Sequence, residues 1–134
     1  MLAFDFIKFP ELTNAQAVIY YWDSPHKQIF EKFEAHVVKV TDGDSIRVIA
    51  DFRDFDFPIR FAYIDAPEMN QGGQESKSWL ENMILGKDVF IKINPNNRVG
   101  KWGRIIGEVM FGGESMSAAS LREQHSVPFG SPLL

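Results

Sequence analysis

The sequence predicts a domain of the α+β class, mainly β, and three observations support this prediction. The chain has 134 residues, which is about the length of one domain. Hydrophobic residues make up 45% of it, and 12 residues are Phe, which is enough for one buried core. After residue 34, short runs of β-branched or alternating apolar residues are separated by Gly, Pro and Asp, which is typical of strands joined by turns.

Residues 1–34 are aromatic and irregular, and we treat them as an N-terminal extension. Thr13 is a typical cap for a helix over 15–21, and the segment Asp-Ser-Pro at 23–25 predicts the start of a second helix over 26–33. We expect this extension to pack on the domain that follows, and a surface for a second copy or a protein partner is the alternative. The aromatic residues concerned are Phe4, Phe6, Phe9, Tyr20, Tyr21 and Trp22.

Residues 35–134 contain five predicted strands and two predicted helices. In chain order these are strands over 35–41, 45–51 and 57–64, a helix over 74–85, strands over 88–93 and 102–110, and a helix over 115–125. A turn over 41–44 joins the first two strands, and Pro67 ends the third because proline lacks a ladder donor. This order is that of a five-stranded OB-type barrel with an inserted helix and a C-terminal helix. On pattern alone, other antiparallel meanders remain as alternatives.

The residue types present limit the chemistry. The chain has no Cys, which excludes disulfides, thiolate zinc sites, iron–sulfur clusters and Cys nucleophiles. Its three His are too few and too scattered to build a zinc site by themselves. The net charge of −4 argues against a protein that coats nucleic acid non-specifically. Carboxylates, arginines, hydroxyls and the backbone must therefore supply any reactive groups.

No part of the sequence predicts a membrane anchor. No stretch reaches the roughly 18 apolar residues that a membrane span needs. The first ten residues contain an acid within their apolar run and lack a basic start, so they do not resemble a signal peptide. We expect a cytoplasmic protein, and a secreted form whose targeting segment has been removed is the alternative.

Three short segments carry residues that could do chemistry. Asp44 follows the first turn and could direct a carboxylate toward a hard cation, although Asp-Gly is also an ordinary turn dipeptide. Asp65 ends an apolar strand just before Pro67, so a carboxylate and freed carbonyls meet where calcium or magnesium could bind, or where a turn is simply capped. Arg104 could enter a cleft, or could cover Trp102 with its stem at the surface.

Together these segments resemble the staphylococcal nuclease-like (thermonuclease) family, from about His36 to His125. The motifs are VTDGDS at 40–45, IRFAYIDAPE at 59–68, WGR at 102–104 and MSAASLR at 116–122. Each motif is modest, but four in order with the expected elements between them form a strong signal. The resemblance implies the five-stranded barrel. It also implies a metal-dependent nuclease that hydrolyses DNA, or RNA as well, and leaves a 5′-hydroxyl and a 3′-phosphate.

The resemblance implies that carboxylates hold a divalent cation. Asp44 and Asp65 would be calcium ligands, with the main-chain carbonyl of Ala66 as a third ligand. Glu68 would lie near a water on the metal, as a general base or an orienting group. Magnesium or another divalent cation is the alternative, since hard ions share a preference for oxygen ligands. Two aspartates and a carbonyl make an open site, so we expect weak metal binding, with Kd roughly 10⁻⁴–10⁻³ M.

The resemblance further implies that cationic residues hold the nucleic acid. Arg60 and Arg104 would bind the scissile phosphate, and Lys101 and Trp102 would contact the substrate. The catalytic and metal positions all carry the residue types of the family, which favours an active enzyme. A catalytically inactive OB-fold module that binds nucleic acid or a protein partner is the alternative. After Ser126 the chain departs from the family, whose nucleotide-stacking tyrosines and last helix have no counterpart here.

Overall fold

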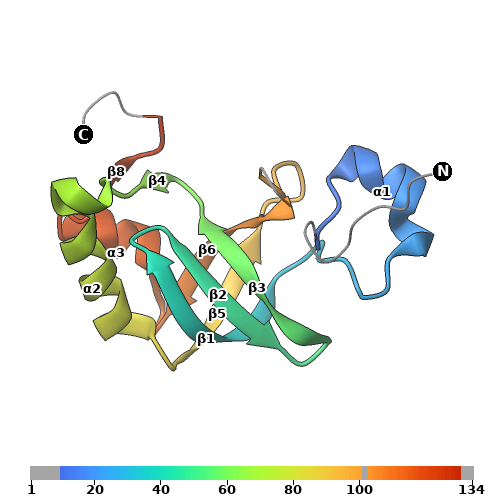
Figure 1. Cartoon of the computed structure of the whole chain (residues 1–134), viewed down its shortest axis with the longest axis horizontal. Coiled ribbons are helices and arrows are strands. Elements are labelled where there is room, and N and C mark those ends of the chain that lie inside the picture. The colour runs from blue at the N-terminus through green and yellow to red at the C-terminus, as the bar shows by residue number, and fades with distance from the viewer. Residues whose placement is uncertain (1–9, 101–102, 131–134) are drawn as a thin grey trace.

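Five strands close into a barrel in the computed structural model, which describes residues 10–100 and 103–130 (Figure 1). They are β1 (Phe33–Asp42), β2 (Ser45–Ala50), β3 (Arg53–Phe61), β5 (Asp88–Ile93) and β6 (Ile105–Phe111). Antiparallel pairing follows the order β3-β2-β1-β5-β6, and parallel pairing of β3 with β6 closes the ring. The predicted fold class and the five-stranded OB-type barrel are therefore confirmed.

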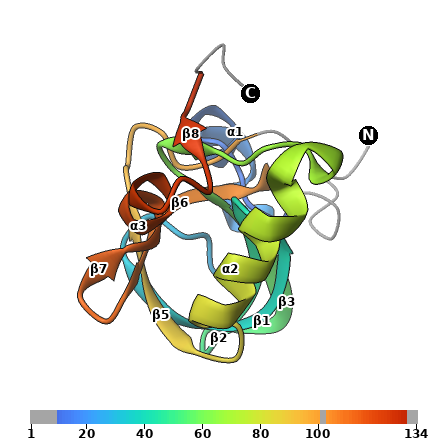
Figure 2. The same ribbon diagram turned by 90° about the vertical axis from the view of Figure 1, so that its left-hand side faces the viewer.

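Short strands and three helices complete the described structure. They are α1 (Asn14–Tyr20), the one-turn η1 (Tyr21–Asp23), β4 (Ile64–Asp65), the turn η2 (Met69–Gly73), α2 (Gln74–Ile84), β7 (Glu114–Ser115), α3 (Met116–Arg122) and β8 (Val127–Pro128). The inserted helix is α2, which lies across one end of the barrel beside α3, while α1 lies at the opposite end (Figures 1 and 2). Within the described ranges, no helix is long and apolar enough to cross a membrane.

The barrel interior is filled by alternate residues of the strands, and the helices α2 and α3 cover one end of it. α2 contributes Leu80 and Ile84, which lie one turn apart on one face and are fully buried. α3 contributes Met116 and Ala119 to the same core. The strand residues in the core include Val37, Ile46, Val48, Phe57, Ile59, Phe61, Ile91, Ile105 and Val109.

The first predicted helix is present and the second is not. α1 begins where expected, because the Thr13 hydroxyl accepts from the Gln16 N–H and the Gln16 side chain accepts from the Thr13 N–H. The helix predicted over 26–33 is wrong, since the chain there is irregular and β1 starts at Phe33. Its backbone bonds to distant side chains: the Ile29 carbonyl, for example, accepts from Arg98. Such hydrogen bonds occupy backbone N–H and carbonyl groups that would pair with one another in a helix.

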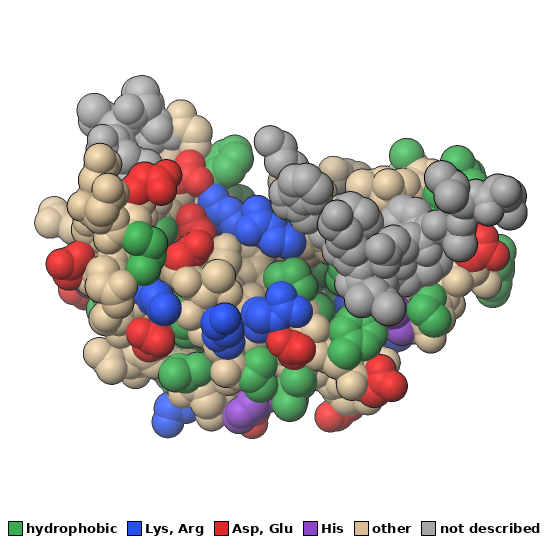
Figure 3. All heavy atoms as spheres, viewed as in Figure 1, with side chains coloured by type: hydrophobic (Ala, Val, Ile, Leu, Met, Phe, Trp, Pro, Cys, Tyr) green, Lys and Arg blue, Asp and Glu red, His purple; other side chains and the backbone are tan. Residues whose placement is uncertain are grey.

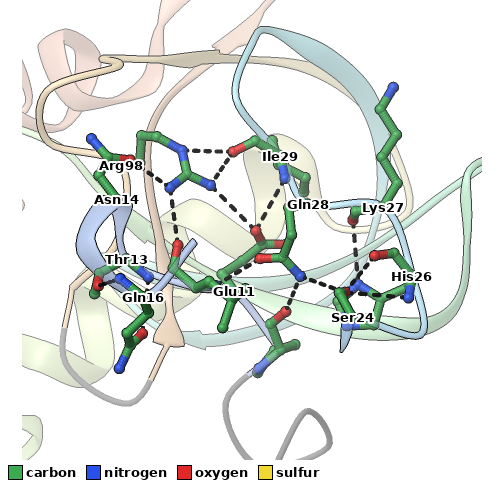
Figure 4. Close-up of polar contacts among 12 residues, drawn as sticks. Glu11, Thr13, Asn14, Gln16, Ser24, His26, Lys27, Gln28, Ile29 and Arg98 are labelled. Carbon is green, nitrogen blue, oxygen red and sulfur yellow. Dashed lines mark hydrogen bonds and ion pairs between the residues drawn. The ribbon is translucent and has the colours of Figure 1, made fainter. Parts of the chain in front are cut away.

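Glu11 attaches the N-terminal extension to the barrel (Figure 4). Its side chain is 1% exposed, forms an ion pair with Arg53 of β3, and has Oε2 3.6 Å from Arg98 Nη2. The Ile29 N–H donates to the same carboxylate at 3.1 Å. Arg98 also donates to the carbonyl of Leu12 at 3.0 Å. A buried charged cluster therefore joins segments that are far apart in the sequence.

Tyr21 and Trp22, two of the aromatic residues expected to pack on the barrel, are exposed. Trp22 is 92% exposed, and Tyr21 is exposed beside it with the two rings 5.1 Å apart. The predicted packing role of Phe4, Phe6 and Phe9 falls outside the described residues. The described contacts between the extension and the barrel include the buried polar cluster and the His26 ring, which lies 5.1 Å from the ring of Phe55.

Candidate active site

Asp44, Arg60 and Asp65 meet beside the β1–β2 turn. The register of β2 against β3 places Ser45 opposite Arg60. Asp44, the residue before Ser45, therefore lies next to Arg60. Arg60 Nη1 is 3.3 Å from Asp44 Oδ2, and Arg60 Nη2 is 2.5 Å from Asp65 Oδ1. On the face drawn in Figure 3, acidic side chains gather around β4 and this turn, with basic side chains beside them. Both predicted aspartate ligands thus share one guanidinium.

Several hydrogen bonds fix the Asp44 carboxylate. The Ala66 N–H donates to Asp44 Oδ2 at 2.8 Å, and the Ser45 hydroxyl donates to Oδ1 at 3.2 Å. The Asp44 N–H donates in turn to the Asp42 side chain at 3.0 Å, which forms an Asx turn. The carboxylate is held in one orientation before any ligand binds.

Gly43 allows α2 to pack directly against this turn. A Cβ at position 43 would lie 2.0 Å from Ser76 Oγ and 3.0 Å from the Cβ of Ala66. Real side chains do not approach so closely, so only glycine fits between α2 and the segment after β4. The turn is therefore more than a hairpin connection, because its packing sets the position of Asp44.

Arg60 is oriented by the backbone as well as by the aspartates. Its Nη1 donates to the carbonyls of Phe61 at 3.0 Å and of Ile64 at 2.9 Å. β3 ends at Phe61, earlier than the predicted end of this strand at residue 64. The guanidinium is partly buried and preorganised, as a group that stabilises charge in a transition state must be.

The predicted metal ligands and the predicted base line one pocket of about 370 Å³. Its walls are Asp42, Asp44, Asp65, Ala66, Pro67, Glu68 and Met69. No group of three or more His, Asp or Glu side chains in the described ranges is close enough to hold a metal ion by itself. The three predicted ligands, two carboxylates and the Ala66 carbonyl, would nonetheless offer the oxygen donors that hard cations accept. This donor set fits a cation that keeps most of its other ligands from solvent or substrate.

Arg104 lies immediately before β6, and the structure does not bring it into contact with the Asp44–Arg60–Asp65 group within the described ranges. The next residue, Ile105, lies opposite Ile59 in the parallel β3–β6 pair, so Arg104 enters one strand away from Arg60. Its buried Nε has no hydrogen-bond partner in the described part of the chain. Such a donor suits an anion that is yet to bind. The predicted contacts of Lys101 and Trp102 fall outside the described residues.

Burial raises the pKa of Asp44 to about 6, from an ordinary value of 3.8. The hydrogen bond with Asp42 acts in the same direction, while the Ala66 N–H and the Arg60 guanidinium oppose the rise. Keeping the Asp44 carboxylate charged at neutral pH therefore costs the folded chain free energy. Such a cost is common for groups in functional sites and is the opposite of what a stabilising ion pair produces.

The variant Asp44→Asn should be more stable than the parent at neutral pH in the absence of metal. A folded-state pKa above the unfolded value means that the folded chain binds the proton more tightly, so the parent loses stability as pH rises from 3.8 to about 6. Two pKa units correspond to a difference on the order of 2–3 kcal/mol. Urea unfolding with chelator at about pH 4 and about pH 7.5 measures it. The prediction would be contradicted if the difference in free energy of unfolding between variant and parent were no larger at pH 7.5 than at pH 4.

Three features of the site were not predicted from the sequence. Asp42 lines the pocket, and its position two residues before Asp44 in the same turn is the sequence feature that could have predicted this. Tyr63 has a φ of +75°, which is rare for a bulky residue, and nothing in the sequence indicates it. β8 pairs with β4, and the Gly130 N–H donates to Asp65 Oδ2 at 3.1 Å.

Comparison with known protein families agrees with this geometry. A family model described as staphylococcal nuclease homologue matches residues 58–124, which is half of the chain. The matched segment contains Arg60, Asp65, Glu68 and Arg104, while Asp44 precedes it. A search of curated proteins finds no match.

Proposed function

The chain belongs to the family of staphylococcal nuclease homologues, and from this premise we propose that it is a metal-dependent nuclease that hydrolyses phosphodiester bonds of DNA. One observation carries the proposal: a guanidinium and two carboxylates are in direct contact at a pocket that a further carboxylate lines. The residues concerned are Arg60, Asp44, Asp65 and Glu68.

We propose that Asp44, Asp65 and the carbonyl of Ala66 hold a calcium ion, with magnesium as the alternative. When bound, the ion supplies positive charge against the phosphate and lowers the pKa of water. With only two carboxylates, the site should bind the ion weakly, and nucleic acid should strengthen its binding by completing the ligand set.

The remaining residues act on the phosphate and the nucleophile. Arg60 and Arg104 present planar guanidinium groups that match phosphate oxygens in pairs and stay charged throughout the reaction. The Nε of Arg104 is a donor that awaits an acceptor in the described structure. Glu68 lines the same pocket and can accept or orient the proton of an attacking water. We propose that cleavage leaves a 5′-hydroxyl and a 3′-phosphate, and that RNA is a second substrate to be tested.

Removal of metal should abolish the activity. Supercoiled plasmid incubated with the full chain and calcium should be nicked, and added EDTA should stop the nicking, because the two aspartates cannot stabilise the phosphate without a cation. Agarose gels measure the reaction, and end-labelled oligonucleotides identify the product ends. Absence of nicking with every divalent metal tested, or nicking that EDTA does not affect, would overturn the proposal.

A matched pair of aspartates provides the control. Asp65→Asn should lose calcium-dependent nicking, because it removes one of the proposed ligands. Asp56→Asn changes an aspartate of β3 that pairs with Arg47 on the barrel surface, with Arg47 Nε and Asp56 Oδ2 2.6 Å apart. That variant should nick plasmid like the parent. Equal loss in both variants would point to a general effect on the fold.

A further inference from the structure

The helix α1 and the η1 turn that follows it carry an apolar stripe that faces solvent. The residues of the stripe follow the spacing i, i+3, i+4 and i+7, which brings them to one side of a helix. They are Ala15, Val18, Ile19 and Trp22. Val18 is 87% exposed, Ile19 71% and Trp22 92%, and Ala15 is exposed as well. An amphipathic helix normally turns such a stripe toward a core, whereas this stripe is in contact with water.

α1 gains little from burial within its own chain. It has seven residues, and none of them is buried. Polar contacts hold its first turn: the Thr13 capping box, and an Asn14 side chain that donates to the Pro95 carbonyl and accepts from Arg98, each at 2.9 Å. Helices this short are marginal in water and owe most of their stability to the packing of an apolar face. A partner that covers the stripe would supply that packing.

Two further aromatic rings enlarge the stripe. The Tyr21 ring lies 5.1 Å from that of Trp22 and 6.2 Å from that of Phe30. Tyr21 is 42% exposed and Phe30 is 40% exposed. We call the six residues the extension patch: Ala15, Val18, Ile19, Tyr21, Trp22 and Phe30. Trp22 alone presents on the order of 200 Å², so the patch offers several hundred Å², which on a single chain usually marks an interaction surface.

The charge of this region indicates the kind of partner. Residues 12–22 include no Asp, Glu, Lys or Arg, although these types make up 24% of the chain. A nucleic acid or an anionic membrane would require Lys or Arg here, and a charged protein surface would require opposite charges. An uncharged surface rich in Tyr, Trp and Phe is typical of the centre of a protein–protein interface.

We propose that the extension patch binds the same patch of a second copy, so that the chain forms a two-fold symmetric dimer. In such a dimer one surface must be complementary to itself, and an apolar stripe without charges meets its copy without like-charge repulsion. A standard interface uses about 800 Å² of each partner, so this smaller patch should give a weak dimer, with Kd on the order of 1–100 μM.

The proposed dimer leaves the candidate active site accessible. α1 lies at the end of the barrel opposite α2 (Figure 1). The turn that carries Asp44 packs against α2, since a Cβ at Gly43 would collide with Ser76 of that helix. Each copy therefore keeps its own pocket away from the interface. The inference goes beyond the proposed nuclease function and does not depend on it.

Sedimentation velocity of the full chain from about 1 μM to about 500 μM tests the proposal. The mass should rise from the 15.3 kDa of one chain toward twice that value. Trp22→Ala should raise the dissociation constant by at least roughly 30-fold, because a buried Trp is a typical centre of binding energy and both copies lose it. Added salt should not weaken the association, since no charged group lies in the patch.

A matched pair of isoleucines separates the interface from a general effect of charge. Ile19→Lys places a cation in the patch of both copies, so the chain should stay monomeric over the whole range. Ile49→Lys makes the same change at an exposed isoleucine of β2 and should dimerise like the parent. Because both side chains are exposed in one chain, both variants should keep the circular dichroism spectrum of the parent.

Cross-linking locates the contact independently. The chain has no Cys, so Val18→Cys introduces a single thiol at the centre of the stripe. A short bismaleimide should link two copies of this variant into a dimer on a denaturing gel. Ile49→Cys, which places the thiol on the barrel, should remain a single chain.

The proposal is overturned if the parent stays at the mass of one chain at about 500 μM, or if Ile19→Lys and Ile49→Lys associate alike. A monomeric parent that floats with phosphatidylcholine vesicles would identify a lipid surface as the occupant of the patch. A monomeric parent that binds no vesicles would leave the patch to a different protein. Either result excludes the second copy.

Discussion

Arg60→Ala should lower the rate of DNA cleavage by at least roughly 10²–10³-fold while the barrel remains folded. Arg60 forms ion pairs with both Asp44 and Asp65, and its guanidinium is fixed by two backbone carbonyls. A preorganised positive fork costs no rearrangement when charge develops on the phosphate. Plasmid nicking under single-turnover conditions measures the loss, and circular dichroism checks the fold.

The same variant should not bind calcium more weakly. In the described structure the Arg60 guanidinium neutralises the two aspartates, so its removal leaves two carboxylates with no cation between them. Calcium should then bind at least as tightly as to the parent, and isothermal titration calorimetry measures this affinity. The variant should therefore lose catalysis, as measured by plasmid nicking, without losing metal binding. Arg47→Ala, which removes a surface arginine of the neighbouring strand, should leave both readouts unchanged. A loss of activity of less than about threefold in both Arg60→Ala and Arg104→Ala would exclude these arginines from the mechanism.

Local patterns were sufficient to predict most of the barrel. The β1–β2 hairpin follows from β-branched runs around an Asp-Gly turn, and α1 follows from the Thr13 capping box. The predicted helix over 26–33 failed because a plausible local cap competed with bonds from far away. Glu11 and Arg98, which are 18 and 69 residues from Ile29, take its backbone groups. No local signal reports such partners.

The sequence picks out three residues that the structure brings together, but not the contacts between them. Asp44, Arg60 and Asp65 stand out because their residue types and neighbours match a known pattern. That Arg60 bridges the two aspartates depends on the register between β2 and β3, which the sequence does not state. The pairing of β4 with β8 beside Asp65 joins two strands of two residues each, which are too short to have a recognisable period. The part of the site that the sequence left open is therefore the part built by long-range pairing.

The second large effect concerns stability and lies away from the pocket. Glu11→Ala should lower the free energy of unfolding by about 3–5 kcal/mol, because it leaves the buried guanidiniums of Arg53 and Arg98 without their carboxylate. It also leaves the Ile29 N–H without its acceptor and opens a cavity where the side chain is now fully enclosed. Urea unfolding at neutral pH measures the change.

An exposed ion pair is the matched control for the buried one. Asp56→Ala removes the partner of Arg47 on the barrel surface, where solvent screens both charges, so it should cost less than about 1 kcal/mol. Because Glu11 joins the N-terminal extension to β3, its loss should also expose the segment around Ile29 to limited proteolysis before the barrel unfolds. Plasmid nicking by Glu11→Ala at low temperature should resemble that of the parent, since the cluster lies at the end of the barrel opposite α2. If Glu11→Ala and Asp56→Ala cost the same, the buried cluster does not hold the extension to the barrel, and the apolar contacts of Leu12 and Ile29 must do so instead.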